Sequence, residues 1–320
     1  MNTIYWVLNM KIGIALSGGG IRGIAHAGVL KALEENEIKI DIIGGTSSGS
    51  LIASLYAMGY TPYYIYVLFK RYAGEIIAIE TKPIISGIGG FLFNKKIQVT
   101  GLKSGKSLEE AYDELALKKG IKTIKEIQMP LVIPAVDMYT STEYIFTSKM
   151  PNSMDGETTV YKGFSYKELS QADKKVEFSQ HEPKKYITDI SIGKSVRASS
   201  SFPVVFSPCE YNNHLFLDGG ILNNTPVNEI KKQGADKVIA VNFDSQPVNK
   251  DSNIMELMMK TLDIMGDKIS DENMANSDYI LTIPSDGTGL LDTSKLDFCY
   301  QSGYKTAMSK MEELKQLLDK

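Results

Sequence analysis

The sequence contains few of the residues from which metal sites, disulfide frameworks and nucleic-acid surfaces are built. Among its 320 residues are two cysteines, Cys209 and Cys299, and three histidines. The cysteines lack metal-ligand spacing and cannot form a disulfide framework, so we predict reduced thiols and no metal. Lysine and arginine number 35 against 38 acidic residues, and this net charge of −3 at pH 7 argues against a nucleic-acid partner.

Long apolar runs are also missing. The apolar stretch at residues 4–8 has no basic region before it and is too short for a signal peptide or a membrane span. We expect residues 1–10 to be an N-terminal extension, or the product of an upstream start codon, and residues 11–320 to form one domain. The default location is the cytoplasm, without a transmembrane segment and with transient contact to a membrane surface.

Short apolar runs alternate with stretches of helical periodicity along the chain. The runs predict buried strands at residues 11–16, 41–45, 131–137, 237–242 and 279–283. Apolar residues at helical spacing predict a long helix over residues 254–269 and one last helix over residues 307–318. With 43% hydrophobic residues, this alternation predicts an α/β fold with a mostly parallel central sheet flanked by helices.

The sequence Gly45-Thr46-Ser47-Ser48-Gly49 places a serine at a predicted strand-to-helix turn. A serine at such a corner is held on a tight, strained turn, above a helix N-terminus that stabilises negative charge. Enzymes of acyl transfer often present their nucleophile in this way. The G-x-S-x-G pattern alone is common, and it is the strand before it and the helix after it that favour Ser47 as a nucleophile.

No histidine is an evident base for this serine. In α/β-hydrolases the catalytic residues follow one another in the chain as serine, acid and histidine. Here the candidate acid is Asp218, near residue 220 of the chain, and none of the three histidines follows it. We predict that His26, one turn into the first helix and close to the glycine loop, packs or hydrogen-bonds there rather than catalysing. We also predict that His214 lies in an exposed polar turn and that His181 belongs to a polar insertion.

The sequence Asp218-Gly219-Gly220 follows a short apolar strand and offers a carboxylate instead. The pattern is typical of an ordinary turn. An aspartate with its usual pKa of about 3.9 is a weak base. Partial burial would raise that pKa, and a direct hydrogen bond to Ser47 would position the carboxylate for proton transfer.

A glycine loop joins the first predicted strand to the first helix, with the sequence Ser17-Gly18-Gly19-Gly20-Ile21-Arg22-Gly23. The backbone N–H groups of such a loop bind an anion, either a phosphate or the oxyanion of a tetrahedral intermediate. The loop also fits the G-x-G-x-x-G pattern of dinucleotide binding. That function needs an acidic residue at the C-terminal end of the next strand, where Ser47 follows instead and Asp41 lies at the opposite end.

Four motifs together resemble those of the patatin-like phospholipase family, in the family's order, between residues 11 and 243. They are the glycine loop, the Ser47 motif, the block Ala198-Ser199-Ser200-Ser201-Phe202-Pro203, and Asp218-Gly219-Gly220. The resemblance implies a three-layer architecture and a Ser47–Asp218 dyad without a catalytic histidine. It also implies an oxyanion hole from the loop, here Gly18, Gly19, Gly20 and Ile21, with Arg22 helping to shape it.

The activity that this resemblance implies is hydrolysis of fatty-acyl esters of phospholipids or lysophospholipids through an acyl-enzyme, without a metal or other cofactor. Two other functions stay open. A soluble carboxylesterase or thioesterase would use the same dyad and prefer short, water-soluble esters. A lipid-binding protein would carry the dyad as a remnant, which the intact motifs disfavour.

Two segments interrupt the regular alternation. Residues 83–100 are rich in glycine and apolar residues, among them Phe91 and Phe93, with Lys95 and Lys96 beside them. They form either a lid whose phenylalanines contact lipid substrate or a buried connection. Residues 149–185 are polar and look like a variable insertion, which either borders an acyl groove or is solvated.

Charge at the two phenylalanines tests the lipid-contact hypothesis. Replacing Phe91 and Phe93 by aspartate is expected to weaken binding to liposomes, because an unpaired carboxylate is costly to bury in apolar surroundings. Hydrolysis of a soluble ester should continue. Liposome co-sedimentation and a soluble-ester assay measure the two properties, and equal loss of both would indicate a buried connection.

Overall fold

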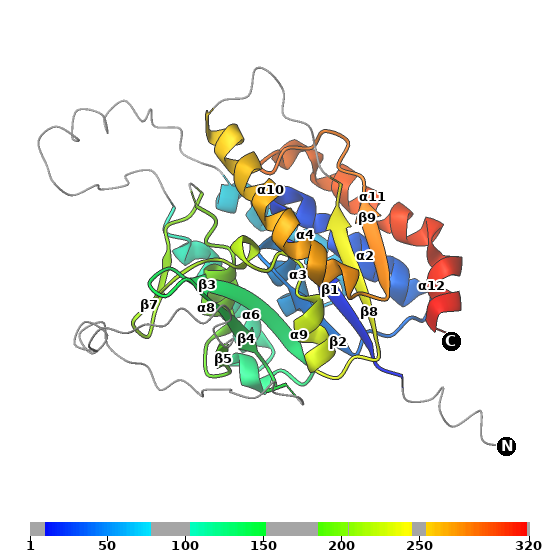
Figure 1. Cartoon of the computed structure of the whole chain (residues 1–320), viewed down its shortest axis with the longest axis horizontal. Coiled ribbons are helices and arrows are strands. Elements are labelled where there is room, and N and C mark those ends of the chain that lie inside the picture. The colour runs from blue at the N-terminus through cyan, green and yellow to red at the C-terminus, as the bar shows by residue number, and fades with distance from the viewer. Residues whose placement is uncertain (1–9, 78–102, 152–184, 204, 245–253, 319–320) are drawn as a thin grey trace, which may run out of the picture.

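The structure is a computed structural model that describes residues 10–77, 103–151, 185–203, 205–244 and 254–318 (Figure 1). Within these residues nine strands form one sheet along the path β5-β4-β3-β2-β1-β8-β9, with β7 paired to β3 and β6 paired to β7. The strands are β1 (Ile12–Leu16), β2 (Ile42–Gly45), β3 (Leu131–Asp137), β4 (Thr142–Thr147), β5 (Lys185–Ile187), β6 (Cys209–Tyr211), β7 (His214–Asp218), β8 (Lys237–Phe243) and β9 (Tyr279–Ile283). Pairing is parallel from β3 through β2, β1 and β8 to β9, and antiparallel where β3 meets β4 and β7.

Helices cover both faces of the sheet. They are α2 (Ile24–Glu35), α3 (Ser48–Ala57), α4 (Pro62–Ile77), α6 (Lys106–Lys118), α8 (Ile192–Ser199), α9 (Val227–Lys232), α10 (Ile254–Ala275), α11 (Leu296–Ser309) and α12 (Met311–Leu318), with short 3-10 turns that include η1 (Gly20–Gly23) and η3 (Gly219–Ile221). In Figure 1, α9 and α10 lie in front of β1 and β8, and α2 lies behind them. The predicted α/β fold with a mostly parallel sheet and flanking helices is confirmed.

The central strands are apolar on both sides because each contacts helices on both faces. In β1, Ile14 and Leu16 belong to the large core that includes residues of α2, α3 and α11. Ala15, between them, packs on the opposite face with Val227 and Ile230 of α9.

The predicted bounds of these strands were accurate to one residue. The strands β3 and β9 have the predicted bounds, while β1 and β2 begin one residue later than predicted and β8 ends one residue later.

One edge of β3 carries two partners in succession. Near its start, β3 pairs in parallel with Ile43 and Gly44 of β2. Further along, Ala135 of β3 pairs with Asp218 at the end of β7, which runs antiparallel. Since β4 pairs along the other edge, β2 and β7 approach each other from opposite directions, and their C-terminal ends meet beside the middle of β3.

One helix prediction was wrong. The chain forms two helices, α11 and α12, where the apolar spacing predicted one over residues 307–318. Lys310, with φ −106° and ψ 6°, leaves the helical conformation and ends α11. The apolar period continues across this break because Ala307, Met311 and Leu314 all pack into the same core.

Several expectations concern residues that the structure does not describe. Phe91 and Phe93 lie within residues 78–102, and most of the polar insertion lies within residues 152–184, both outside the described ranges.

The long helix predicted over residues 254–269 is present as α10, which extends to Ala275. No helix within the described residues combines the length and the apolar character needed to cross a bilayer.

Two glycines allow α2 and α11 to pack backbone against backbone. A Cβ added at Gly28 would overlap the carbonyl of Tyr300, and a Cβ added at Gly303 would overlap the carbonyl of Ala25. The segment before α11 contributes Leu290, whose carbonyl accepts a hydrogen bond from the N–H of Ile21 at 2.8 Å. The segment that leads into α11 thus also holds the glycine loop.

Substitution at this crossing should be costly. Gly28→Ala and Gly303→Ala are each expected to destabilise the fold by about 1–3 kcal/mol, because overpacking forces the two backbones apart. Gly289→Ala is the matched control, since no atom lies within 4 Å of its added Cβ. Urea unfolding of the three variants measures the difference, and equal stabilities would contradict the close crossing.

Candidate active site

Ser47 lies on a strained turn between β2 and α3. It has φ 52° and ψ −124°, a conformation that serine rarely adopts, and it immediately precedes the first residue of α3. A Cβ at Gly45 would overlap Gly49, and a Cβ at Gly49 would overlap the carbonyl of Leu16. Such strain is typical of a nucleophile held at a sharp strand-to-helix corner. The two glycines are needed because the turn folds tightly against the end of β1.

Asp218, the last residue of β7, is buried with 1% of its surface exposed. Its Oδ1 accepts a hydrogen bond from the N–H of Gly220 at 2.8 Å, while Oδ2 accepts no well-formed hydrogen bond from the described residues. Burial raises the pKa of this carboxyl to about 7, against the opposing effects of the Ser47 side chain and the Gly220 N–H. Asp218 is thus a much stronger base than an exposed aspartate.

One pocket contains both residues and part of the glycine loop. Ser47, Asp218, Gly18, Gly19 and Gly20 all line it. The rest of its lining is largely apolar and includes Leu51, Phe69, Ala73, Leu108, Phe202, Val205, Phe206, Ile221, Leu290 and Leu291. The fold therefore brings residues of all four motifs, which are far apart in the sequence, into one pocket with a largely apolar lining.

The N–H groups of the glycine loop differ in availability. Gly18 donates to both the carbonyl and the Oδ1 of Asn224, at 3.2 and 3.0 Å, and Ile21 donates to Leu290. Among the described residues, Gly19 and Gly20 donate no backbone hydrogen bond, and both line the pocket. Of the residues expected at the oxyanion hole, Gly19 and Gly20 thus retain unused main-chain donors.

Arg22 and His26 hold this loop from its buried side. The Nε of Arg22 donates to the carbonyl of Gly19 at 3.2 Å, and its guanidinium lies 5.2 Å from the ring centre of Phe243. The Nε2 of His26 lies 2.8 Å from the carbonyl of Ser17, which only accepts, so Nε2 carries the proton. Burial lowers the pKa of His26 to about 4, so the ring is neutral. The prediction that His26 hydrogen-bonds locally is confirmed.

The prediction for His214 was wrong. Its side chain is 8% exposed, and its Nδ1 lies 3.2 Å from Oδ2 of the buried Asp137. The ring also contacts Tyr144 and Phe216. The polar sequence around His214 indicated a surface turn, but the pairing of β7 with β3 carries the ring inward beside Asp137.

The serine block at residues 198–203 also holds the candidate dyad, a role that the sequence analysis did not predict. The hydroxyl of Ser199 accepts the N–H of Ser47 at 3.0 Å, and the carbonyl of Ser201 accepts the N–H of Asp218 at 3.1 Å. The serine block was recognised as a motif, yet its spacing alone did not show which backbone groups it contacts.

The pair Asn223–Asn224 links the same site from another direction. The carbonyl of Asn223 accepts the Thr46 hydroxyl at 2.8 Å, and Asn224 binds the N–H of Gly18. These two neighbours follow the Asp218 turn shortly after the end of β7 and therefore join it to both the Ser47 turn and the glycine loop.

This fold and these motifs define a known class of serine hydrolases. The chain belongs to the patatin-like phospholipase family, whose match extends over residues 14–230 and includes all four motifs. At the C-terminal end of β2, where a dinucleotide-binding domain requires a carboxylate, the chain instead places Ser47. Asp41, at the other end, accepts the N–H of Ile12 at 3.1 Å.

Similar proteins include two named lysophospholipase NTE1. The protein of Candida albicans is 26% identical over 332 residues, which cover 93% of this chain and 20% of that protein. The protein of Meyerozyma guilliermondii is 30% identical over 243 residues, which cover 74% of this chain and 13% of that protein. This chain thus spans a fifth or less of the length of these relatives.

Among solved structures, human GIVD cytosolic phospholipase A2 in complex with methyl gamma-linolenyl fluorophosphonate aligns with 97% of this chain and 58% of that chain. The sequence identity is 9% and the TM-score 0.49. The fold class is therefore assigned from the strand order described above and not from this alignment.

The raised pKa of Asp218 predicts a pH-dependent stability difference. An ordinary aspartate ionises in the unfolded chain near pH 4, whereas Asp218 in the folded chain keeps its proton until about pH 7. The folded state therefore loses stability as pH rises through this window. Asp218→Asn carries no such penalty, so its stability advantage over the parent should widen by roughly 3 kcal/mol between pH 5 and pH 8.

Urea unfolding at the two pH values measures this change. Comparing the same variant at both values cancels any pH-independent effect of the amide. A stability difference that stays constant between pH 5 and pH 8 would contradict a raised pKa at Asp218.

Proposed function

We propose that this chain is a lipid acyl hydrolase that cleaves fatty-acyl esters of phospholipids or lysophospholipids. The observation that carries the proposal is a buried carboxylate of raised pKa beside a strained serine, in one largely apolar pocket. Family membership supports the reaction class. The name lysophospholipase, given to the NTE1 relatives, supports the lipid substrate.

In the proposed mechanism Ser47 is the nucleophile and Asp218 the general base. As the Ser47 hydroxyl attacks the ester carbonyl, its proton passes to the Asp218 carboxylate and a tetrahedral intermediate forms. Asp218 then returns the proton to the departing alcohol, leaving an acyl-enzyme. Water, deprotonated by Asp218, cleaves the acyl-enzyme and regenerates the Ser47 hydroxyl.

Gly19 and Gly20 are the proposed oxyanion donors because both residues line the pocket and their N–H groups donate no backbone hydrogen bond among the described residues. Gly18 acts in this proposal as an anchor of the loop, since Asn224 occupies its N–H. Arg22 shapes the loop through the carbonyl of Gly19. Loss of one oxyanion donor typically lowers the rate about 100- to 1000-fold.

The apolar lining favours a long acyl chain over a small polar group. Phe69 and Ala73 from α4, Leu108 from α6, and Phe202 with Phe206 from the segment after α8 surround the space beside the dyad. Burial of apolar surface stabilises binding by about 25 cal/mol per Å², so each additional methylene that enters this pocket strengthens binding.

The dyad is tested by fatty-acid release from mixed phospholipid and lysophospholipid micelles. Ser47→Ala is expected to abolish release, and Asp218→Asn to reduce it about 100- to 10 000-fold, because each removes one partner in proton transfer. Ser54→Ala is the matched control: the hydroxyl of this buried serine of α3 donates to the Leu51 carbonyl at 3.1 Å, within its own helix. Parent-like release from either dyad variant would refute the assignment, and a parent that prefers short soluble esters would indicate a carboxylesterase.

Activity should also depend on pH in a defined direction. Only the ionised Asp218 accepts a proton, and its pKa is raised to about 7. We therefore expect kcat/KM on a soluble ester to rise with pH and to level off above about pH 7. A plateau that already begins near pH 5 would contradict Asp218 as the base.

A further inference from the structure

Arg197 of α8 is a buried cation with no role in the proposed dyad. Only 2% of its surface is exposed, and it is among the largest fully buried side chains of the described residues. No carboxylate of these residues lies within ion-pair distance of it, and burial lowers its pKa from the usual value for arginine. A buried charge is costly unless it is well hydrogen-bonded, so its neighbours indicate its purpose.

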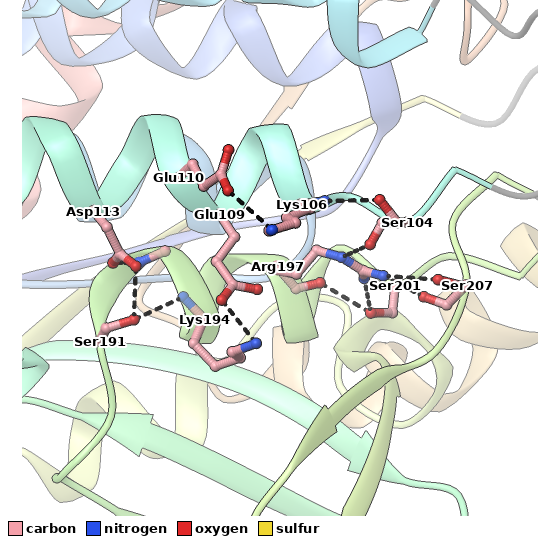
Figure 2. Close-up of polar contacts among 11 residues, drawn as sticks. Ser104, Lys106, Glu109, Glu110, Asp113, Ser191, Lys194, Arg197, Ser201 and Ser207 are labelled. Carbon is pink, nitrogen blue, oxygen red and sulfur yellow. Dashed lines mark hydrogen bonds and ion pairs between the residues drawn. The ribbon is translucent and has the colours of Figure 1, made fainter.

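The guanidinium bonds to three separate points of the chain, as Figure 2 shows. Its Nε donates to the carbonyl of Ser104 at 2.7 Å, just before α6. Its Nη1 donates to the hydroxyl of Ser201 at 2.5 Å, and its Nη2 donates to the carbonyl of Ser207 at 2.6 Å. One side chain thus joins the start of α6 to both ends of the segment after α8.

These attachment points flank one wall of the pocket, formed by Leu108, Phe202, Val205 and Phe206. The ring of Phe206 lies 5.5 Å from the guanidinium carbon, which places Arg197 against this wall. The N–H of Lys103 donates to the carbonyl of Val205 at 3.2 Å, so the two chain segments are also joined directly.

The space for the guanidinium is built into the backbone. Gly105, the residue before α6, has φ +66°, and a Cβ there would overlap the Nε of Arg197. A side chain at this position would displace the guanidinium from the Ser104 carbonyl. The sequence therefore keeps this corner clear for Arg197.

The Arg197 side chain does not bond to either residue of the candidate dyad. Among the described residues, Arg197 bonds to Ser104, Ser201 and Ser207 rather than to Ser47 or Asp218, and it does not line the pocket. Asp218 is held by its pairing with β3 and by the main-chain carbonyl of Ser201. Arg197 meets Ser201 at its hydroxyl, and this hydroxyl also donates to the main-chain carbonyl of Arg197 at 2.9 Å, a bond that remains when the guanidinium is lost. Loss of the guanidinium should loosen the wall and leave the chemistry beside Ser47 in place.

We propose that Arg197 is a positioning residue that fixes the Leu108–Phe202–Val205–Phe206 wall and thereby confers preference for long acyl chains, an inference that rests on the proposed acyl-hydrolase function. A long chain must pack along this wall, whereas a short acyl group occupies only the space beside the dyad. Lysine does not replace arginine here, because a single ammonium group does not span three acceptors in a fixed plane.

The test compares Arg197→Lys and Arg197→Gln with the parent on p-nitrophenyl butyrate and p-nitrophenyl palmitate. We expect KM for the palmitate to rise about tenfold or more, as the wall shifts from its productive position. Both kcat/KM for the butyrate and its pH profile should stay within about threefold of the parent, since the dyad is unaffected. The informative quantity is the palmitate-to-butyrate ratio of kcat/KM, which a smaller folded fraction alone does not change.

Lys194→Met is the matched control. Lys194 lies one turn before Arg197 on α8 and pairs with Glu109 of α6 at 2.7 Å, so its loss weakens the same α6–α8 contact without touching the wall (Figure 2). Its selectivity ratio should equal that of the parent. A ratio that falls equally in Lys194→Met would overturn the proposal, because general loosening of the two helices would then explain the effect.

Should the Arg197 variants not fold, Ser207→Ala removes only a hydroxyl that accepts from Nη2 at 3.2 Å. A smaller fall in the same ratio supports the proposal, and an unchanged ratio overturns it. An unchanged ratio in folded Arg197 variants of an active parent would overturn this inference alone. A parent inactive on both esters and on lipid micelles would overturn the proposed function and this inference together.

Discussion

The antiparallel approach of β7 to the end of β2 is the constraint on which the candidate site depends. Both strands pair with the same edge of β3, one near its start and the other near its end. Their C-terminal residues therefore meet, and Ser47 and Asp218 enter one pocket. If β7 were parallel to β3, Asp218 would lie at the far end of β3, away from the Ser47 turn.

This arrangement places two energetically unfavourable features, a buried carboxylate and a strained backbone, in the same pocket. Asp218 is buried without full hydrogen bonding among the described residues, and Ser47 has a strained backbone. The surrounding structure compensates through main-chain bonds from the serine block, the Asn223–Asn224 pair and the tight packing of α2 on α11. Such local cost, offset by a rigid scaffold, is typical of sites where chemistry occurs.

Polar contacts between α6 and α8 stabilise the structure further from the dyad. Asp113 of α6 accepts the N–H of Gly193 at 2.7 Å and so fixes the start of α8. Near the end of α8, Arg197 joins the start of α6 to the segment after α8 (Figure 2). Sequence patterns indicated neither role, because both depend on which backbone groups a helix meets after folding. The same limit explains His214: its neighbours in sequence are polar, but its neighbours in space are Asp137 and aromatic rings.

The sequence by itself determined the features that depend on neighbouring residues in the chain, namely the strands, the glycine turns and the family motifs. Apolar runs fixed the central strands nearly to the residue, glycines marked the turns around Ser47 and before α2, and the four motifs identified the family. Only the tertiary structure decided which loop donors remain unused, how deeply Asp218 is buried, and where α11 ends and α12 begins. These properties depend on contacts between segments distant in sequence, and the pairing of β7 with β3 decides the most important of them.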